Sequence, residues 1–319
     1  MILKIVYFGS SEFSVPFLKK IIASSQEIVA VFTNADKKKG RGRKLASNPV
    51  KVAAASEGIK VFEIEEAGKD LIGDLLRLTF DYAVVISFGM ILPAEVFEKW
   101  PGKWLNLHPS ILPQYRGPSP MISALLDGAK QTGVTINDVV YEVDAGRIFA
   151  QTKFDIEESD NLDSLEKKVI FFGGPLLIKV LDMIADTGYQ PFSQGEEGIS
   201  YTRKINKADL LIDWSEDARE IVNRIRAFSS RPGAYGVLGG ERIKILKASV
   251  AGGTGDEAAS RRGGEPVGTI IAATVKERLL IRCGGGIVRI ETLQLPGKKP
   301  VDYRSFINGY HPGVGDRFK

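Results

Sequence analysis

The chain has 319 residues, and because domains usually hold about 100–200 residues, this length predicts two domains. Hydrophobic residues make up 44% of the sequence and charged residues 26%, which excludes a disordered or collagen-like chain. The net charge of +4 is unevenly distributed. Residues 206–319 carry 19 basic and 13 acidic side chains, whereas residues 1–205 carry 24 and 26. This surplus predicts that the last third of the chain contacts an anionic partner.

Cysteine and histidine are too few and too scattered for a disulfide or a transition-metal site. The chain has one cysteine, Cys283, and two histidines, His108 and His311. No apolar run approaches the ~18–20 residues of a membrane span, and the first residues are typical of a strand rather than of a targeting segment. We therefore expect a cytoplasmic protein in a reducing compartment, with no metal and no membrane contact.

The first half of the chain predicts alternating strands and helices. Continuous apolar runs, typical of strands buried on both faces, cover residues 5–8, 28–33 and 82–87. Helical spacing, and Asn48 as an N-cap before Pro49, predict helices over residues 13–24, from 49 onward and over 70–78. This alternation predicts an open, mostly parallel, Rossmann-like α/β sheet that binds ligands beyond the carboxyl ends of its strands.

The second half predicts one long helix and then a small OB-like β-barrel. The helix covers residues 164–186, and the Gly-Gly-Pro sequence at 173–175 is expected to be able to interrupt it. Residues 187–200, rich in Gly, Gln, Glu and Pro, predict a linker. A strand over 208–214 and a helix over 215–228, capped by Ser215, precede strands at 236–238, 243–250, 267–272, 278–282 and 286–295, with a loop at 251–264. We therefore expect a first domain at residues 1–188, a linker at 189–206 and a second domain at 207–319.

Asn106 and His108 are the strongest candidates for a catalytic pair. They stand two residues apart at the end of a predicted strand, so their side chains share one face, and Pro109 ends the strand just beyond them. An amide donor beside an imidazole suits stabilisation of an oxyanion together with transfer of an amine proton, although an isolated Asn-x-His is more often structural. Asp144, in a turn between strands predicted over 134–141 and 148–154, offers a carboxylate to orient the imidazole.

Other common catalytic arrangements are missing from the sequence. Gly9 follows the first predicted strand, where a dinucleotide-binding loop belongs, but the second and third glycines of that fingerprint are absent. Neither a Walker lysine motif nor a Gly-x-Ser-x-Gly nucleophile motif occurs. Cys283 falls in the predicted barrel, and we interpret it as structural.

A basic segment follows the second predicted strand, on the ligand-binding edge of the sheet. Six of the eight residues 37–44 are basic, and the other two are glycines. A charge run is usually only a solvated loop, but six uncompensated positive charges repel one another unless an anion arrives, so we favour phosphate binding. In the second domain, Arg261, Arg262, Lys298 and Lys299 add positive charge to a barrel that suits a nucleic-acid backbone.

Taken together, these motifs resemble the methionyl-tRNA formyltransferases, of the folate-dependent N-formyltransferase family, over nearly the whole chain. Residues 106–113 with Arg116-Gly117 resemble the family's Asn-x-His-x-Ser-Leu-Leu-Pro…Arg-Gly motif, and residues 144–146 resemble its Asp-x-Gly. Residues 87–93 resemble its folate-pocket loop, 40–44 its tRNA-binding insertion, and 202–205 and 293–299 parts of its C-terminal domain. The departures are Ser10-Ser11 in place of Thr-Pro, Ile111 in place of Leu and Glu142 in place of Gly.

The resemblance implies that a monomer transfers a formyl group from 10-formyltetrahydrofolate, without a metal, to the α-amino group of initiator methionyl-tRNA. Catalytic roles then fall to Asn106, His108 and Asp144. Folate contacts fall to Phe88, Gly89, Met90, Ile91, Leu92, Ser110, Ile111, Leu112 and Pro113. Contacts with tRNA fall to Lys37, Lys38, Lys39, Arg41, Arg43, Lys44, Lys298 and Lys299. Three alternatives stay open: a formyltransferase acting on a sugar-nucleotide amine, a non-catalytic RNA-binding protein and a nicotinamide-dependent oxidoreductase.

Overall fold

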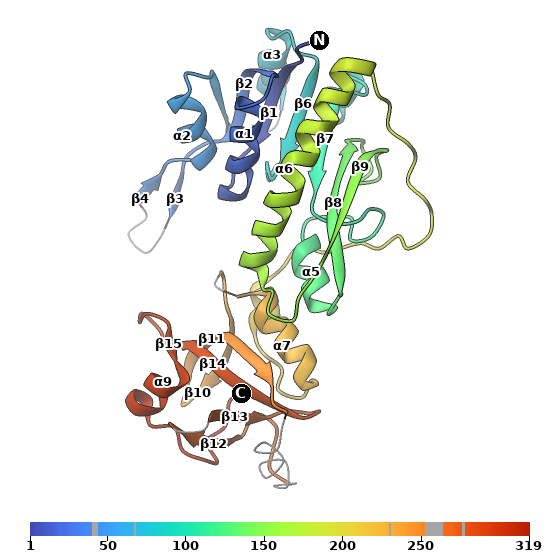
Figure 1. The fold of residues 1–319 in the computed structure, drawn as a ribbon. Helices are drawn as coiled ribbons and strands as arrows, with labels where there is room; N and C mark the ends of the chain where they lie inside the picture. Colours follow the sequence, from blue (N-terminus) through green and yellow to red (C-terminus); the bar gives the residue numbers. More distant parts are fainter. Residues whose placement is uncertain (40–43, 67, 230, 253–263, 276–277) are drawn as a thin grey trace. The chain divides into compact units, whose positions relative to one another are not determined.

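The computed structural model describes the chain except for residues 40–43, 67, 230, 253–263 and 276–277 (Figure 1). The chain folds into two compact units, each described by itself below. Unit 1 comprises Met1–Pro120, Gln131–Asp155 and Glu166–Thr202, and unit 2 comprises Met121–Lys130, Ile156–Leu165 and Arg203–Lys319. The limits expected for the domains and the linker, 1–188, 189–206 and 207–319, stay a prediction.

Unit 1 is built on a seven-stranded sheet with the strand order β5-β2-β1-β6-β7-β8-β9. In chain order these strands are β1 (Lys4–Gly9), β2 (Glu27–Asn34), β5 (Val61–Ile64), β6 (Tyr82–Ile86), β7 (Trp104–His108), β8 (Gln131–Asp138) and β9 (Ile148–Asp155). The pairings from β5 through β7 are parallel, while β8 pairs antiparallel with both β7 and β9. The mostly parallel sheet predicted from the apolar runs is therefore confirmed.

Helices cover both faces of this sheet (Figure 1). They are α1 (Val15–Ile22), preceded by the short 3-10 helix η1 (Glu12–Ser14), α2 (Pro49–Ser56), α3 (Lys69–Leu76), α4 (Ala94–Lys99) and α6 (Leu162–Thr187). On the face that α3 and α4 cover, Phe32 stacks between Phe8 and Phe62, with ring centroids 4.8 and 4.6 Å apart. Stacked aromatic rings of this kind bury a large apolar area. As predicted, Asn48 caps α2, because its side chain accepts a hydrogen bond from Val50 N.

The long helix α6 continues without interruption through the Gly-Gly-Pro sequence that was expected to be able to break it. Gly173 lies directly against β7 and β8. A Cβ atom at this position would stand 3.1 Å from Val134 Cγ1 and 3.2 Å from Leu107 Cδ1, closer than most real contacts. The glycine therefore lets the helix backbone approach the sheet, and this packing offsets the low helix propensity of the sequence.

Unit 2 is an antiparallel sheet with the strand order β10-β11-β14-β13-β12, and β15 pairs with β14. Its strands are β10 (Ala234–Leu238), β11 (Glu241–Val250), β12 (Ile270–Thr274), β13 (Arg278–Arg282), β14 (Ile287–Gln294) and β15 (Val301–Asp302). Helices α5 (Pro120–Leu126), α7 (Ala218–Ala227) and α9 (Tyr303–Tyr310) contribute side chains to its core. The sequence did not predict β15, α5 or α9.

The C-terminal residues join the two edges of this sheet. Val237 of β10 and Lys319 exchange two backbone hydrogen bonds of 2.8 Å. On the other edge, Phe318 N donates to Gly268 O at 2.9 Å, and Ile270 N donates to Asp316 O at 2.8 Å. The expected small barrel is therefore confirmed, its strands pair antiparallel, and its OB-like type stays a prediction. Most of the expected loop at residues 251–264 lies outside the described residues.

The strand predicted over residues 208–214 is wrong. This stretch begins instead inside the short 3-10 helix η2 (Lys207–Leu210). The Asp209 carboxylate accepts a hydrogen bond from Asn206 N at 2.6 Å and pairs with Arg203, so local hydrogen bonds outcompete strand pairing. The same Arg203 guanidinium lowers the pKa of the Asp209 carboxyl to about 2.

The prediction that Ser215 caps the next helix is also wrong. Ser215 N and Oγ both donate to Asp213 Oδ1, at 2.9 and 2.6 Å, in the turn before α7. The N-cap of α7 is Asp217, whose carboxylate accepts from Arg219 N at 2.8 Å, while Glu220 accepts from Asp217 N at 3.1 Å. A carboxylate is the better cap here because it also interacts favourably with the positive end of the helix dipole.

We predict that Asp217→Ala lowers the free energy of unfolding by about 1 kcal/mol, the usual contribution of an N-cap side chain. Urea unfolding followed by circular dichroism measures this difference. Ser215→Ala is the matched control, with an expected loss clearly smaller than that of Asp217→Ala. Equal losses for the two variants would contradict the assignment of Asp217 as the cap.

Candidate functional site

The predicted catalytic residues come from β7 and from the connection between β8 and β9. Asn106 and His108 lie in the second half of β7, at the carboxyl end of the parallel strands. Because β8 runs antiparallel to β7, its last residue, Asp138, pairs with Leu105 near the start of β7. The connection after β8 must therefore turn back along β7 to bring Asp144 to His108.

Asp144 lies between the amide and the imidazole. Its Oδ1 is 3.4 Å from Asn106 Nδ2, and its Oδ2 is 3.5 Å from His108 Nδ1. The Asn106 amide also donates to Asn137 Oδ1 at 3.3 Å. His108 is buried, Asn106 is half-buried, and the Asp144 side chain keeps 16% of its surface exposed. The structure thus brings together the three side chains that the sequence singled out, and the carboxylate is partly exposed to solvent.

Both ring nitrogens of His108 have defined neighbours. Nε2 lies 2.9 Å from the Tyr115 carbonyl oxygen. A carbonyl oxygen only accepts hydrogen bonds, so this contact requires the proton on Nε2. Nδ1 then faces the Asp144 carboxylate, and a proton taken up at Nδ1 lies directly between ring and carboxylate. His108 is therefore placed to accept or release a proton on the Asp144 side.

The backbone around this site adopts an uncommon conformation. Ser87 after β6, Tyr115 after β7 and Asp144 have positive φ angles of 49°, 58° and 51°. In the part of the chain that the structure describes, His311 is the one other non-glycine residue in this region of φ. Such conformations cost about 1–3 kcal/mol each and persist only where the surroundings hold them, which is typical of functional sites.

The first predicted folate segment, residues 88–92, follows β6, whose Val85 pairs with Asn106. Phe88 is buried edge-to-face against Phe8, with ring centroids 5.3 Å apart. Met90 and Leu92 pack on the same core, and Gly89 has a φ of 79°. Ile91 is 94% exposed and points away from this core. The buried side chains thus anchor the loop on the core of the sheet, and the loop presents its backbone and Ile91 to solvent.

The second predicted folate segment, residues 110–113, is held against β8 and β9. The buried Thr135 hydroxyl donates to Ser110 O at 2.7 Å and accepts from Leu112 N at 3.2 Å. Gln151 Nε2 donates to Leu112 O at 2.8 Å. The segment also contains half-buried Ile111 and, after a cis peptide bond, Pro113. These bonds fix the chain directly after His108.

The predicted tRNA-contact residues lie in both units. Lys37, Lys38 and Lys39 form β3 (Lys37–Lys39), and Lys44 begins β4 (Lys44–Ala46), an antiparallel hairpin that follows the carboxyl end of β2. Arg41 and Arg43 lie outside the described residues. Lys298 and Lys299 are exposed on unit 2 between β14 and β15.

Asp36 anchors both ends of the β3–β4 hairpin. It stands just before β3, and its carboxylate accepts a hydrogen bond from Asn48 N, just after β4, at 2.8 Å. It also pairs with Lys51 at 3.0 Å, and Lys51 pairs with Glu63 at 2.7 Å. The base of the basic segment is therefore held to α2 and β5.

Residues that the sequence analysis missed complete the site. Part of the expected linker belongs to unit 1 and contacts the Arg116-Gly117 segment: Arg116 N donates to Ser200 O at 2.9 Å, and Thr202 N donates to Arg116 O at 2.7 Å. Gln194 Nε2 bonds to the backbone of the Asp144 turn. Arg116 carried a sequence signal through its motif and Thr202 through the stretch 202–205, whereas Ser200 carried none. Gln194 stands in a polar, turn-rich stretch that shows no periodicity.

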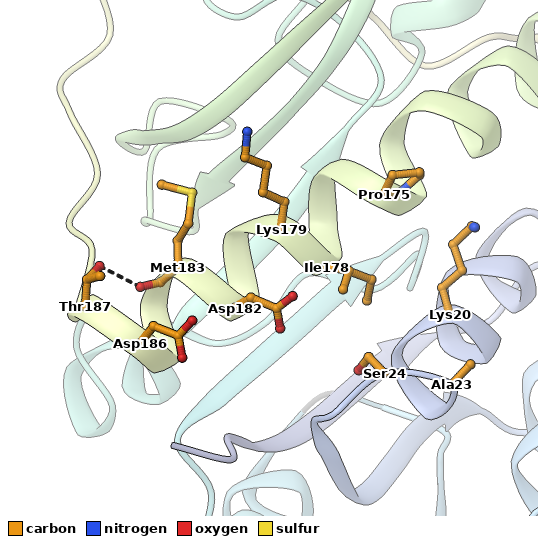
Figure 2. Close-up of a pocket in the computed structure, with 10 residues that line it drawn as sticks. All are labelled: Lys20, Ala23, Ser24, Pro175, Ile178, Lys179, Asp182, Met183, Asp186 and Thr187. Atoms are coloured by element: carbon orange, nitrogen blue, oxygen red, sulfur yellow. Dashed lines mark hydrogen bonds between the residues drawn. The ribbon is translucent and has the colours of Figure 1, made fainter.

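A separate groove of about 650 Å³ lies between α1 and α6 (Figure 2). Lys20, Ser24, Lys179 and Asp182 are among its lining residues. The end of α1 leads into the start of β2, so the groove lies at the amino-terminal edge of the sheet, whereas ligands of open α/β sheets bind at the carboxyl edge. None of the predicted functional residues lines it.

The part of the chain that the structure describes also bears on metal ligation, membrane crossing and the reactivity of the single thiol. Among them, no three His, Cys, Asp or Glu side chains are grouped so that they could hold a metal ion. None of the described helices has the length and apolar character that a membrane crossing needs. Cys283 is buried, its Sγ donates to Gly286 O at 3.1 Å, and burial raises the pKa of its thiol to about 11. A reactive thiolate is therefore scarce near neutral pH, in keeping with a structural role.

We predict that Thr135→Val lowers the free energy of unfolding by about 1–3 kcal/mol, because it keeps the shape but leaves the buried Ser110 carbonyl and Leu112 amide without a partner. Urea unfolding measures the loss. Thr187→Val, which removes an exposed hydroxyl bonded to Met183 O, is the control, with little change expected. If the two variants are equally stable, the hydroxyl does not hold residues 110–113.

Comparison with known proteins agrees with this geometry. Residues 3–181 match the formyl transferase family, and residues 204–311 match the formyl transferase C-terminal domain. The methionyl-tRNA formyltransferase of a Sulfurihydrogenibium species is 35% identical over 319 residues, which cover 99% of this chain and 100% of that protein. The enzyme of the same name from Methylobacillus flagellatus is 34% identical over 320 residues, covering 99% of each chain.

Solved structures show the same fold at lower identity. An N-formyltransferase from Helicobacter canadensis, in complex with folinic acid and dTDP-3-aminofucose, is 24% identical with a TM-score of 0.65 and covers 91% of this chain and 99% of its own. HypX from Aquifex aeolicus is 18% identical with a TM-score of 0.66; the match covers 98% of this chain but only 50% of HypX. With matches to both family domains and relatives above 30% identity over the full length, the chain belongs to the formyl transferase family.

Proposed function

We propose that the protein transfers the formyl group of 10-formyltetrahydrofolate to the α-amino group of methionyl initiator tRNA. The observation that carries this proposal is the convergence of Asn106 and His108 on β7 with Asp144, whose carboxylate oxygens lie 3.4 and 3.5 Å from the amide and the imidazole. It is supported by full-length similarity to proteins named methionyl-tRNA formyltransferase. No nucleophilic side chain is required, because the substrate amine is itself the nucleophile.

In this reaction the amine nitrogen attacks the formyl carbon, and the formyl oxygen becomes an oxyanion. The Asn106 amide and the His108 imidazole stabilise that oxygen as hydrogen-bond donors, which lowers the barrier because the charge develops there. Asp144 orients the imidazole and, through a water molecule, takes part in moving the proton from the attacking amine. The bond between the formyl carbon and the folate nitrogen then breaks, and that nitrogen receives a proton.

The two anchored segments, residues 88–92 and 110–113, are proposed to hold the folate. Ligand pockets usually combine apolar walls with a few directed polar groups. Here the apolar part comes from the exposed Ile91 and the half-buried Ile111, and the polar part comes from backbone groups of the two loops.

The basic residues are proposed to hold the tRNA. Strands β3 and β4 follow the carboxyl end of β2, on the edge of the sheet that carries the loop after β6. Residues 206–319 carry a net surplus of positive charge and present Lys298 and Lys299 on their surface. Phosphate contacts by lysine and arginine position a nucleic acid without reading its bases. The monomeric state and the cytoplasmic location stay predictions.

The direct test is formyl transfer to charged initiator tRNA, to charged elongator methionine tRNA and to a dTDP-amino sugar. We expect initiator tRNA to be the preferred acceptor. Asn106→Ala and His108→Ala should each lower the rate by about 10²–10³, the usual effect of removing one oxyanion donor. Circular dichroism checks that both variants fold.

Preference for the amino sugar would favour the alternative of a sugar-nucleotide formyltransferase. Near-normal turnover by either folded variant would refute its catalytic role. Binding of RNA without any formyl transfer would point instead to a non-catalytic RNA-binding protein.

A second prediction concerns the basic segment. Replacing Arg41 and Arg43 with Ala should raise the KM for tRNA severalfold and make that KM less dependent on salt, because fewer counterions are released from the RNA on binding. The affinity for folate should stay the same. Arg77→Ala with Lys99→Ala removes the same charge from exposed positions at the ends of α3 and α4 and serves as the control. Equal loss of tRNA and folate binding would argue that the segment stabilises the fold instead.

A further inference from the structure

Gln194 is bonded at both ends of its side-chain amide. Nε2 donates to the backbone oxygens of Asp144 and Gly146, at 2.8 and 2.6 Å. Oε1 accepts from Arg116 Nη2 at 2.8 Å and from Nε at 3.3 Å. Exchanging the amide nitrogen and oxygen would set donors against donors and oxygens against oxygens, so the neighbours determine its orientation. One side chain thus connects the Asp144 turn to Arg116.

Arg116 is a firm anchor for this connection. It is 6% exposed, and its backbone pairs with the chain at Ser200 and Thr202. The next residue, Gly117, donates its backbone N–H to Asp144 Oδ2 at 2.7 Å. The same segment therefore holds the turn at three points. Gly117 holds the Asp144 carboxylate, Arg116 acts through Gln194 on the Asp144 carbonyl, and Arg116 Nη1 lies 3.4 Å from Glu142 Oε1.

The Asp144 turn needs such support from outside. Its φ of 51° is unfavourable for a residue with a side chain. Apolar packing contributes little, since the neighbouring side chains Tyr141 and Val143 are 83% and 58% exposed. Hydrogen bonds to the backbone are then what keeps the carboxylate 3.5 Å from His108 Nδ1.

We infer that Gln194 is a positioning residue that holds Asp144 in the conformation required for formyl transfer, acting on the Asp144 and Gly146 carbonyls rather than on a substrate. This inference rests on the proposed function for its activity readout. A displacement of the carboxylate by about 1 Å is enough to lower a rate by roughly 10²-fold in comparable sites. Because Gln194 contacts the turn and Arg116, its loss should affect turnover more than substrate binding.

Two variants of Gln194 separate its contacts with the Asp144 turn from its contact with Arg116, and a variant of Gln190 is the control. Gln194→Ala should lower kcat roughly ten- to hundredfold, with KM for both substrates changed less than about threefold. Gln194→Glu keeps an acceptor for Arg116 but loses the donors to the two carbonyls, so it should lose activity as Ala does while remaining folded. Gln190→Ala removes an exposed amide that bonds to Gly188 O and should retain normal activity.

A double-mutant cycle tests whether Gln194 acts through Asp144. In an Asp144→Asn background, measured by single-turnover formyl transfer, adding Gln194→Ala should cost less than about twofold further. If the two effects instead multiply, or if Gln194→Glu and Gln194→Ala keep wild-type kcat, the inference is wrong. Failure of the wild-type protein to formylate any acceptor would overturn the proposed function instead, so the two outcomes are distinguishable.

Discussion

The contact between the Asp144 carboxylate and His108 Nδ1, 3.5 Å apart, is the interaction on which the proposed site depends. Neighbours in sequence do not produce it, because β8 leaves β7 in the opposite direction and the chain has to turn back over it. The return requires a left-handed conformation at Asp144, a backbone donor at Gly117 and an amide at Gln194. Each of these features helps to fix the Asp144 carboxylate in place. Without them, hydration of the charged carboxylate would favour a position in solvent.

The mixed sheet supplies the two halves of this arrangement. Its parallel part brings the loops after β1, β6 and β7 to one edge, where Ser10 N donates to Ser87 O at 3.2 Å. Its antiparallel part, β8 and β9, supplies Thr135 and Gln151, which hold the chain just after His108. The proposed acyl transfer uses both parts of the sheet. The oxyanion donors lie on β7, and the residues that orient them lie on β8, on β9 and in the connection between these two strands. Preorganisation of this kind avoids reorganisation during the reaction.

Much of the fold could be predicted because it follows from local chemistry. Apolar runs located β1, β2 and β6, and the Asn48-Pro49 sequence located the start of α2. The errors occurred where a carboxylate bonds to the local backbone. Asp209 completes the capping box of η2 in a stretch that was predicted as a strand, and Asp217 instead of Ser215 caps α7. Pro175 was read as a potential break, whereas the contact of Gly173 with β7 and β8 supports a continuous helix.

The sequence by itself determined the alternation of elements, the family motif and the identity of Asn106, His108 and Asp144 as candidates, since these depend on residue type and short spacing. Tertiary structure alone decided that residues 194–202 belong beside Arg116 and that Gln194 reaches the Asp144 turn. A hydrogen bond between residues 50 positions apart leaves no periodic trace in either segment. It exists only because the fold places one backbone carbonyl within reach of one side-chain amide.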